Sequence, residues 1–325
     1  MGKIGIIANP ASGKDVRRLV ARASVFDNQE KQAIVRRAMV GMAQTGQHKI
    51  AYLDDGHGIV RSALEDAGES LHGEIVASTE TGNALDTISA ARALKAAGCD
   101  VVVTLGGDGT NRAVAIGWRD VPVIPISTGT NNVFPVLAEA TVAGAAAGVI
   151  AAGHVALQRV SAQHKVIDVA IDNEREDIAL IDAVLSSERF VGARALLEPD
   201  QLRLALLTRA DPAAVGMTSI GGLLAPLSDR DDFGMLLELG EATTTVNAPI
   251  APGYYRNVGV SQHRQVELGA QISVEGPGIL AFDGERERVL KPNQSALLSL
   301  SRSGPLVVDV EKTMYLAAEK GCFSS

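Results

Sequence analysis

Apolar residues in the first 135 positions form short runs that alternate with stretches of helical periodicity. The runs at 4–8, 49–53 and 73–77 have the length and composition of strands. The runs at 100–105 and 121–126 are continuous rather than alternating, which is typical of parallel strands buried on both faces. Strands and helices that alternate at this spacing predict an open, doubly wound α/β layer.

Two segments between these strands repeat apolar residues at helical spacing. In the segment from 28 to about 45, either Asp27 or Asn28 can cap the first turn. The segment at 84–97 is followed by Gly98, which can adopt the left-handed conformation that often ends a helix. Both segments are therefore predicted to be helices of the α/β layer.

The second half of the chain has a different pattern, which begins after a helix of small residues at 138–152. Short β-rich runs separated by Gly, Pro, Asn and Asp lie at 166–171, 179–185, 235–239, 243–246, 257–260, 271–274 and 296–300. This pattern predicts an antiparallel sheet or sandwich. We therefore expect an α/β nucleotide-binding domain over residues 1–140 and a β-rich domain over 141–305. A C-terminal segment, 306–325, is expected to return to the first domain.

Composition narrows the class of protein. The 325 residues are 46% hydrophobic and 21% charged, which excludes disordered, collagen-like and disulfide-scaffold proteins. A net charge of -8 and an aromatic content of 3% argue against nucleic-acid binding. No apolar run reaches the roughly 18 to 20 residues that span a bilayer. Cys99 and Cys322 could pair, but their spacing does not require it, and reduced thiols in a cytoplasmic protein are the better interpretation.

The strongest local motif, Gly-Gly-Asp-Gly-Thr-Asn at 106–111, directly follows a predicted buried strand. Ligands of open α/β sheets bind at the carboxyl ends of the strands, and glycines let the backbone approach a phosphate closely. Asp108 would need a metal ion or a hydroxyl beside it, because a carboxylate and a phosphate repel each other. The alternative interpretation is a glycine-rich turn in which Asp108 only caps a helix.

Two further polar loops follow predicted strands. The loop at 127–132 follows the next strand, and its hydroxyl and amide groups can donate to phosphate or ribose oxygens. The loop at 9–14 differs from a P-loop, since it lacks the upstream glycine and the hydroxyl residue after the lysine. Taken singly, each of these loops is equally consistent with a polar turn.

The second half offers weaker signals. Asp283 and Glu285 flank a glycine and are most simply interpreted as a hairpin turn with solvated charges, relevant only if the second domain folds over the first. The segments 221–222 and 229–232 are interpreted as loops. The alternative interpretation is that they line a cleft. The six histidines are scattered, so no Cys/His metal site is predicted and the metal ligands stay unknown.

The order of these motifs resembles the superfamily that joins NAD kinases with diacylglycerol and sphingosine kinases. The sequence is most similar to the ATP-NAD kinase-like family of the acetoin catabolism protein X type, and this resemblance extends over nearly the whole chain. The motif at 106–110 carries the resemblance, together with Asn-Pro-Ala-Ser-Gly-Lys-Asp at 9–15, the Thr-Gly-Thr-Asn-Asn loop at 128–132 and Asp-Gly-Glu at 283–285. The resemblance implies an α/β domain and a β-rich domain with the site between them.

By this resemblance, Asp108 is the catalytic residue that orients or deprotonates an acceptor hydroxyl, or helps to hold a metal. Second-domain candidates are Asp182, Asp283 and Glu285. The nucleotide-binding residues would be Asn9, Ser12, Gly13, Lys14, Gly106, Gly107, Gly109, Thr110, Asn111, Thr128, Gly129, Thr130, Asn131 and Asn132.

The implied activity is phosphoryl transfer from ATP, with Mg²⁺, to an alcohol, foremost the ribose of NAD. The sequence departs from this pattern, because Ile181-Asp182 replaces the Asn-Glu pair of NAD kinases and Val133 replaces an aspartate of lipid kinases. Alternatives are a kinase of a lipid or another small alcohol, with Glu285 as base, and a non-catalytic nucleotide-binding regulator of acetoin catabolism. A homo-oligomer with small-molecule nucleotide partners is expected, without nucleic-acid or membrane partners.

Overall fold

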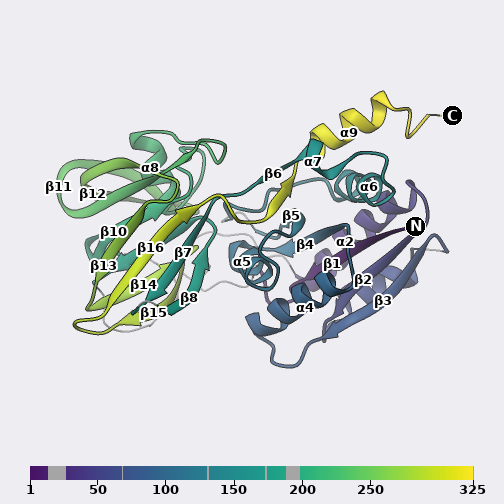
Figure 1. Cartoon of the computed structure of the whole chain (residues 1–325), viewed down its shortest axis with the longest axis horizontal. Coiled ribbons are helices and arrows are strands. Elements are labelled where there is room, and N and C mark those ends of the chain that lie inside the picture. The colour runs from purple at the N-terminus through teal and green to yellow at the C-terminus, as the bar shows by residue number, and fades with distance from the viewer. Residues whose placement is uncertain (14–26, 68, 130–131, 173, 188–197, 325) are drawn as a thin grey trace.

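The computed structural model describes residues 1–13, 27–67, 69–129, 132–172, 174–187 and 198–324. The chain forms two lobes, an α/β lobe that contains both described ends of the chain and a β-rich lobe (Figure 1). This arrangement confirms the predicted fold class. No helix in these ranges is both long enough and apolar enough to span a membrane.

The first lobe is built on a seven-stranded sheet in the order β3-β2-β1-β4-β5-β17-β6. Its parallel strands are β1 (Gly2–Ala8), β2 (His48–Asp54), β3 (Leu71–Ser78), β4 (Val101–Gly106), β5 (Pro122–Ser127) and β17 (Leu306–Val308). The outer strand β6 (Ser161–Gln163) pairs antiparallel with β17. The carboxyl ends of β1, β4 and β5 therefore meet at one edge of the sheet.

Helices cover both faces of this sheet. One face packs against α2 (Asn28–Ala43), α3 (Ile59–Glu65), α6 (Ala140–Ala151), α7 (Leu157–Val160) and α9 (Val310–Glu319). The other face packs against α4 (Ala84–Ala96) and α5 (Asp108–Gly117). Side chains of β1 alternate accordingly, since Ile6 joins the first core and Ile7 the second. A Cβ at Gly144 would collide with the Ala38 carbonyl, so the glycine permits the close approach of α6 to α2.

The second lobe contains two antiparallel sheets. The six-stranded sheet, in the order β12-β11-β10-β9-β14-β15, comprises β9 (Asp182–Ser186), β10 (Leu202–Leu207), β11 (Phe233–Ala251), β12 (Tyr254–Glu267), β14 (Gly278–Phe282) and β15 (Glu285–Leu290). The four-stranded sheet, in the order β13-β16-β7-β8, comprises β7 (Val166–Ile171), β8 (Glu174–Ala179), β13 (Gln271–Glu275) and β16 (Ser295–Ser301).

Apolar side chains of the two sheets form a common core. A second core lies between the six-stranded sheet and α8 (Met217–Leu224). A single-turn 3₁₀ helix (Pro199–Gln201) precedes β10.

Three expectations for the second lobe were wrong. The run at 179–185 is not one strand, because β8 ends at Ala179 and the backbone N–H groups of Leu180 and Ile181 donate to a carboxylate instead of a strand. The runs at 235–239 and 243–246 both belong to β11, which contains an irregularity between them. The segment 221–222 is helical and buried in α8, where a Cβ at Gly222 would strike the Asp211 backbone.

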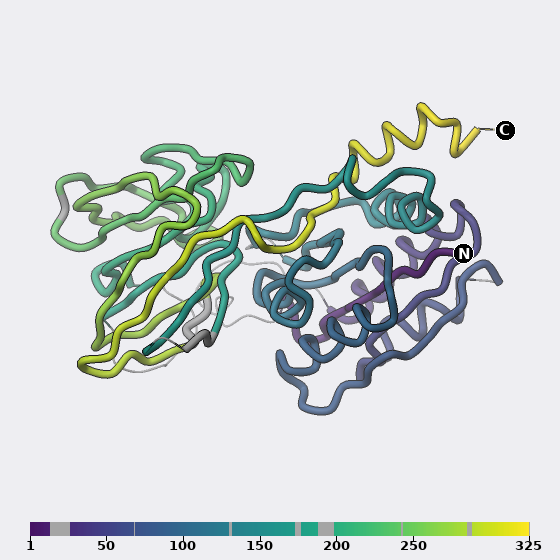
Figure 2. Tube along the Cα trace, in the orientation of Figure 1, coloured from purple at the N-terminus to yellow at the C-terminus, as the bar shows by residue number. Residues whose placement is uncertain are grey.

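The lobes are joined by two crossing segments of chain, β6 to β7 and β16 to β17, coloured teal and yellow in Figure 2. Polar contacts also cross between the lobes. The Arg112 side chain of α5 lies 2.8 Å from the Asp177 carboxylate of β8, and both side chains are more than 90% buried. The Arg119 guanidinium lies 2.7 Å from Asp168 of β7. These contacts fix α5 and the turn that follows it against the second lobe.

Candidate active site

The polar loops after β1, β4 and β5 lie together at the carboxyl edge of the sheet. The Asn9 side-chain amide donates to the Thr110 hydroxyl at 2.9 Å, which joins the first loop to the second. The Thr128 hydroxyl donates to the Ser12 hydroxyl at 3.0 Å, which joins the third loop to the first. Residues from three distant parts of the sequence therefore form one polar surface.

Some residues predicted from the sequence lie outside this description. Lys14, Thr130 and Asn131 fall outside the described residues, as does the side chain of Glu285. Gly13 and Gly129 end the described parts of their loops, and Gly13 has a positive φ of 71°.

A buried lysine supports the first loop. Lys31 of α2 is fully buried, and its Nζ donates to the carbonyl groups of Asn9, Pro10 and Ser12 at 3.1, 3.0 and 2.7 Å. Burying an ammonium group is unfavourable unless its donors are satisfied, so the lysine and the loop fix each other. Lys31 was absent from the predicted site. It lies three and four positions before Ile34 and Val35, on the apolar face of the helix, and that placement was an available signal.

The glycines of the second loop make room for its neighbours. A Cβ at Gly106 would collide with the Thr110 side chain, and one at Gly107 would lie 2.8 Å from Asn132 Oδ1. The Asn132 amide donates to the Ser127 hydroxyl at 2.7 Å. Asn111 bridges Thr104 and the Gly107 carbonyl, with contacts of 2.7 and 2.9 Å, and thereby ties the first turn of α5 to β4. This packing presents the N-terminus of α5 at the polar surface, where helix N–H groups favour an anion.

Asp108 links the second and third loops. Its carboxylate accepts hydrogen bonds from the backbone N–H groups of Val133, at 3.0 and 3.1 Å, and Phe134, at 2.8 Å. The N-cap of α5 is Gly107, so Asp108 does more than cap its own helix. Arg209, from the second lobe, donates to the Val133 carbonyl. A residue of each lobe therefore forms hydrogen bonds with the segment 133–134 and holds it in place.

A pocket between the lobes brings three acidic residues together. Asp108 and Val133 of the first lobe line it, with Ile181, Asp182, Val215, Gly216, Met217, Ile250, Asp283 and Gly284 of the second lobe. The catalytic candidate Asp108 and the second-domain candidates Asp182 and Asp283 therefore border the same pocket. The remaining lining side chains are apolar.

Asp283 occupies the turn between β14 and β15. The turn was correctly interpreted as a hairpin, and Asp283 and Gly284 have φ values of 51° and 79°. The expected solvation was wrong for Asp283, since its carboxylate is buried and accepts the N–H groups of Leu180 and Ile181 at 3.0 and 2.7 Å. Burial raises its pKa to about 8; Arg112 opposes this shift and Asp182 adds to it. Burial therefore favours the protonated form of the Asp283 carboxyl group.

This combination of a parallel-sheet lobe, a glycine-rich turn after its central strand and a facing β-rich lobe defines the NAD kinase and diacylglycerol kinase fold. Yeast NADH kinase complexed with NADH has this fold, with a TM-score of 0.53 and 14% identity over 100% of this chain and 89% of that chain. A Bacillus anthracis str. Sterne protein described as a diacylglycerol kinase has it as well, with a TM-score of 0.50 and 11% identity over 94% and 96% of the two chains.

The sequence comparisons are more specific. Residues 4–155 match the ATP-NAD kinase N-terminal domain, and residues 165–303 match the acetoin catabolism protein X C-terminal domain. Acetoin catabolism protein X of Cupriavidus necator is 36% identical over 331 residues, which cover 96% of this chain and 91% of that protein. The chain belongs to the acetoin catabolism protein X family.

Proposed function

We propose that this protein transfers a phosphoryl group from ATP to an alcohol in the pocket between its lobes. The observation that carries the proposal is the meeting of Asp108, Asp182 and Asp283 around one pocket, next to the N-terminus of α5. Phosphoryl transfer depends mainly on positioning and on stabilising charge, and this arrangement supplies both. The kinase-type N-terminal domain supports the same activity.

The donor phosphates would bind at the glycine-rich turn. The N-terminus of α5 and the polar groups of Asn9, Ser12 and Thr128 face this region from three loops. Backbone N–H groups at a helix N-terminus bind phosphate without an added side-chain charge. Backbone geometry as well as side-chain type therefore supports a donor site at this turn.

Mg²⁺ fits this site only together with the substrate. Among the described residues, no group of three or more His, Cys, Asp or Glu side chains is placed to hold a metal ion. Asp108 and Asp182 are carboxylates of the kind that Mg²⁺ prefers, and substrate phosphate oxygens would complete the ligand set. The bound ion would offset the repulsion between the carboxylates and the phosphates.

The acidic residues have different roles toward the acceptor hydroxyl. Asp108 orients it, because two backbone N–H groups hold its carboxylate in a fixed direction. Asp182 accepts the hydroxyl proton, since it lines the same pocket as Asp108 and the raised pKa of its neighbour Asp283 favours a single negative charge on the pair. Gly284 N–H, 3.3 Å from Asp182 Oδ1, helps to orient this base.

The acceptor has two candidates. The ribose hydroxyl of NAD is the first, because the N-terminal domain is of the ATP-NAD kinase type and a structural neighbour was solved with NADH. A compact neutral alcohol is the second. It is favoured by the pocket lining, in which apolar side chains accompany three acids and no described residue is cationic. The name of the Cupriavidus relative makes acetoin, a small hydroxyketone, the first such compound to test.

The test is a turnover assay with Mg-ATP and each acceptor. NADP formation is followed with a coupled dehydrogenase, and phosphorylated alcohols are followed by ³¹P NMR. We expect turnover with one acceptor class and its loss in Asp108→Asn and Asp182→Asn, whereas the exposed control Asp120→Asn stays active. Nucleotide binding without turnover across the panel would contradict the proposal and favour a non-catalytic regulator.

A further inference from the structure

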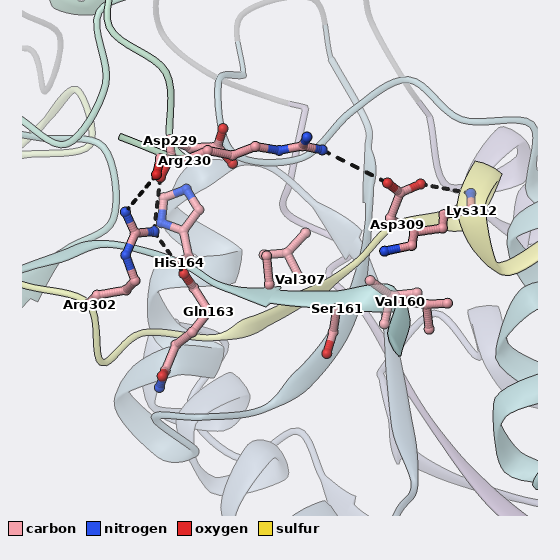
Figure 3. Close-up of a pocket in the computed structure, with 12 residues that line it drawn as sticks. Val160, Ser161, Gln163, His164, Asp229, Arg230, Arg302, Val307, Asp309 and Lys312 are labelled. Atoms are coloured by element: carbon pink, nitrogen blue, oxygen red, sulfur yellow. Dashed lines mark hydrogen bonds and ion pairs between the residues drawn. The ribbon is translucent and has the colours of Figure 1, made fainter. Parts of the chain in front are cut away.

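A second, larger pocket, here called the hinge pocket, lies at the two segments of chain that join the lobes. It is separate from the pocket lined by Asp108, Asp182 and Asp283, here called the acidic cleft. The hinge pocket has a volume of about 440 Å³ and contains none of the motif residues that form the candidate active site. Its polar lining includes His164, Asp229, Arg230, Arg302, Asp309 and Lys312. Figure 3 shows these side chains around a floor made by β6 and β17. A cavity of this size suits a small metabolite.

One wall of this hinge pocket is a loop, 228–233, that two cationic side chains hold in place. Lys165 is fully buried and donates to the carbonyl groups of Ser228 and Phe233, at the two ends of the loop, at 2.9 and 2.8 Å. Arg302 donates to the carbonyl groups of Asp229, Arg230 and Asp231 at 3.0, 3.2 and 2.7 Å. The backbone that carries Arg230 is therefore held by hydrogen bonds from Lys165 and Arg302.

His164 forms the inner corner of the same wall. Its side chain is about 95% buried, and its Nδ1 lies 2.6 Å from the Lys165 carbonyl, so Nδ1 carries the proton. Burial lowers the pKa of this imidazole to about 4, which keeps the ring neutral and leaves Nε2 as a hydrogen-bond acceptor. The pocket thus offers a neutral acceptor on the wall that carries Asp229, across from the carboxylate of Asp309.

The opposite wall belongs to the first lobe. Asp309 caps α9 by accepting the Lys312 N–H at 2.9 Å, so the positive end of this helix faces the pocket. Arg230 reaches across from the second lobe to within 4.0 Å of the Asp309 carboxylate, as Figure 3 shows. Its side chain is 81% exposed, and an exposed pair at this distance is weak. Arg230 is therefore available to a ligand with a stronger negative charge.

We infer that the hinge pocket binds a small phosphorylated polyol, with its phosphate between Arg230 and Lys312 and its hydroxyl groups at Asp229, Asp309 and His164. Arg230 and Lys312 belong to different lobes, so the bound phosphate bridges them and stabilises one relative orientation. The binding site is separate from the acidic cleft and does not depend on the kinase chemistry proposed above.

Isothermal titration of the full chain with glucose 6-phosphate tests this inference. We expect binding that weakens at least tenfold in Arg230→Gln and in Lys312→Gln. The matched control Lys49→Gln removes an exposed charge from β2 and should leave the affinity unchanged. Asp108→Asn should also retain it, which separates this pocket from the cleft.

Three further probes sharpen the result. Glucose, which lacks the phosphate, should not bind, and inorganic phosphate should bind more weakly than the sugar phosphate. Succinate binding that matches or exceeds that of glucose 6-phosphate would overturn the assignment of a phosphorylated polyol. Undiminished glucose 6-phosphate binding in the Arg230→Gln/Lys312→Gln double variant, or no binding to the wild-type chain at millimolar concentration, would overturn the site itself.

Discussion

The Nζ atom of Lys31 lies 2.7 Å from the carbonyl oxygen of Ser12, in the loop after the first strand. This contact places a fully buried positive charge directly under the polar surface on which the donor phosphates are proposed to bind. Ser12 in turn accepts the Thr128 hydroxyl, so the lysine supports two of the three loops.

Replacing Lys31 with Met should loosen that surface. The substitution leaves the carbonyl groups of Asn9, Pro10 and Ser12 without their donor, and we expect a loss of stability of about 3 kcal/mol. ATP affinity should fall about tenfold, with a smaller change in kcat. Denaturant unfolding and steady-state kinetics measure the two effects. Lys49→Met is the exposed control, and an unchanged KM for ATP in Lys31→Met would refute the role of the lysine in nucleotide binding.

Replacing Gly107 with Ala should damage the donor site by a steric route. The added methyl group would lie 2.8 Å from Asn132 Oδ1, so Asn132 must move away and weaken its contact with Ser127. We expect ATP affinity to fall at least tenfold while the unfolding midpoint changes by only a few degrees. Gly56→Ala is the control, because nothing lies within 4 Å of its added Cβ. Equal nucleotide affinity in the two variants would show that the close packing at Gly107 is unimportant.

Asp283 should make the stability of the protein depend on pH. Its pKa is about 8 in the folded chain against 3.8 for the free side chain, so between these values the native state holds a proton that the unfolded chain has released. The free energy of unfolding should therefore decrease as pH rises from about 4 to about 8, and this contribution should level off above that range. Urea unfolding at several pH values measures the slope.

The variant Asp283→Asn isolates this contribution. An asparagine keeps an acceptor for the N–H groups of Leu180 and Ile181 and resembles the protonated acid, so the fold should be retained. The decrease in stability between pH 4 and 8 should become shallower than in the wild type. The exposed control Asp120→Asn should keep the wild-type slope, and identical slopes for all three proteins would contradict the raised pKa.

The ion pair of Arg112 and Asp177 should be important for stability because both side chains are buried. Arg112→Met removes the cation and leaves the Asp177 carboxylate with Arg288 at 3.6 Å, so we expect a loss of about 3 kcal/mol. Arg112→Met/Asp177→Asn should recover part of that loss, since no buried carboxylate is left at that position. A double variant no more stable than Arg112→Met would contradict this explanation.

The periodicity of apolar residues was sufficient to predict the fold class, because β1, β4, β5, α2 and α4 each have a strong local pattern of apolar positions. It failed at residues 180–181, where the backbone donates to a carboxylate about a hundred positions away. No local pattern can report such a partner. The same limitation concealed the burial of Asp283, whose Asp-Gly turn is locally identical to a solvated one.

For the candidate site, sequence order indicated which loops share an edge of the sheet, since parallel strands place their carboxyl ends together. The contacts of Asp108 with Val133 and Phe134 required the three-dimensional structure, because they join side chain and backbone across two loops. The supporting role of Lys31 could have been predicted from the sequence, since a lysine on the apolar face of a helix needs buried acceptors.

The position of β17 between β5 and β6 has a consequence for the synthesis of the chain. Residues 306–308 complete the first lobe, yet they leave the ribosome after almost the entire second lobe. Until then β5 is an open edge with unpaired backbone groups, and the emerging first lobe is exposed to strand exchange and aggregation. A fragment that ends near residue 155 would keep this defect permanently. The last 20 residues therefore close a lobe that the first residues begin.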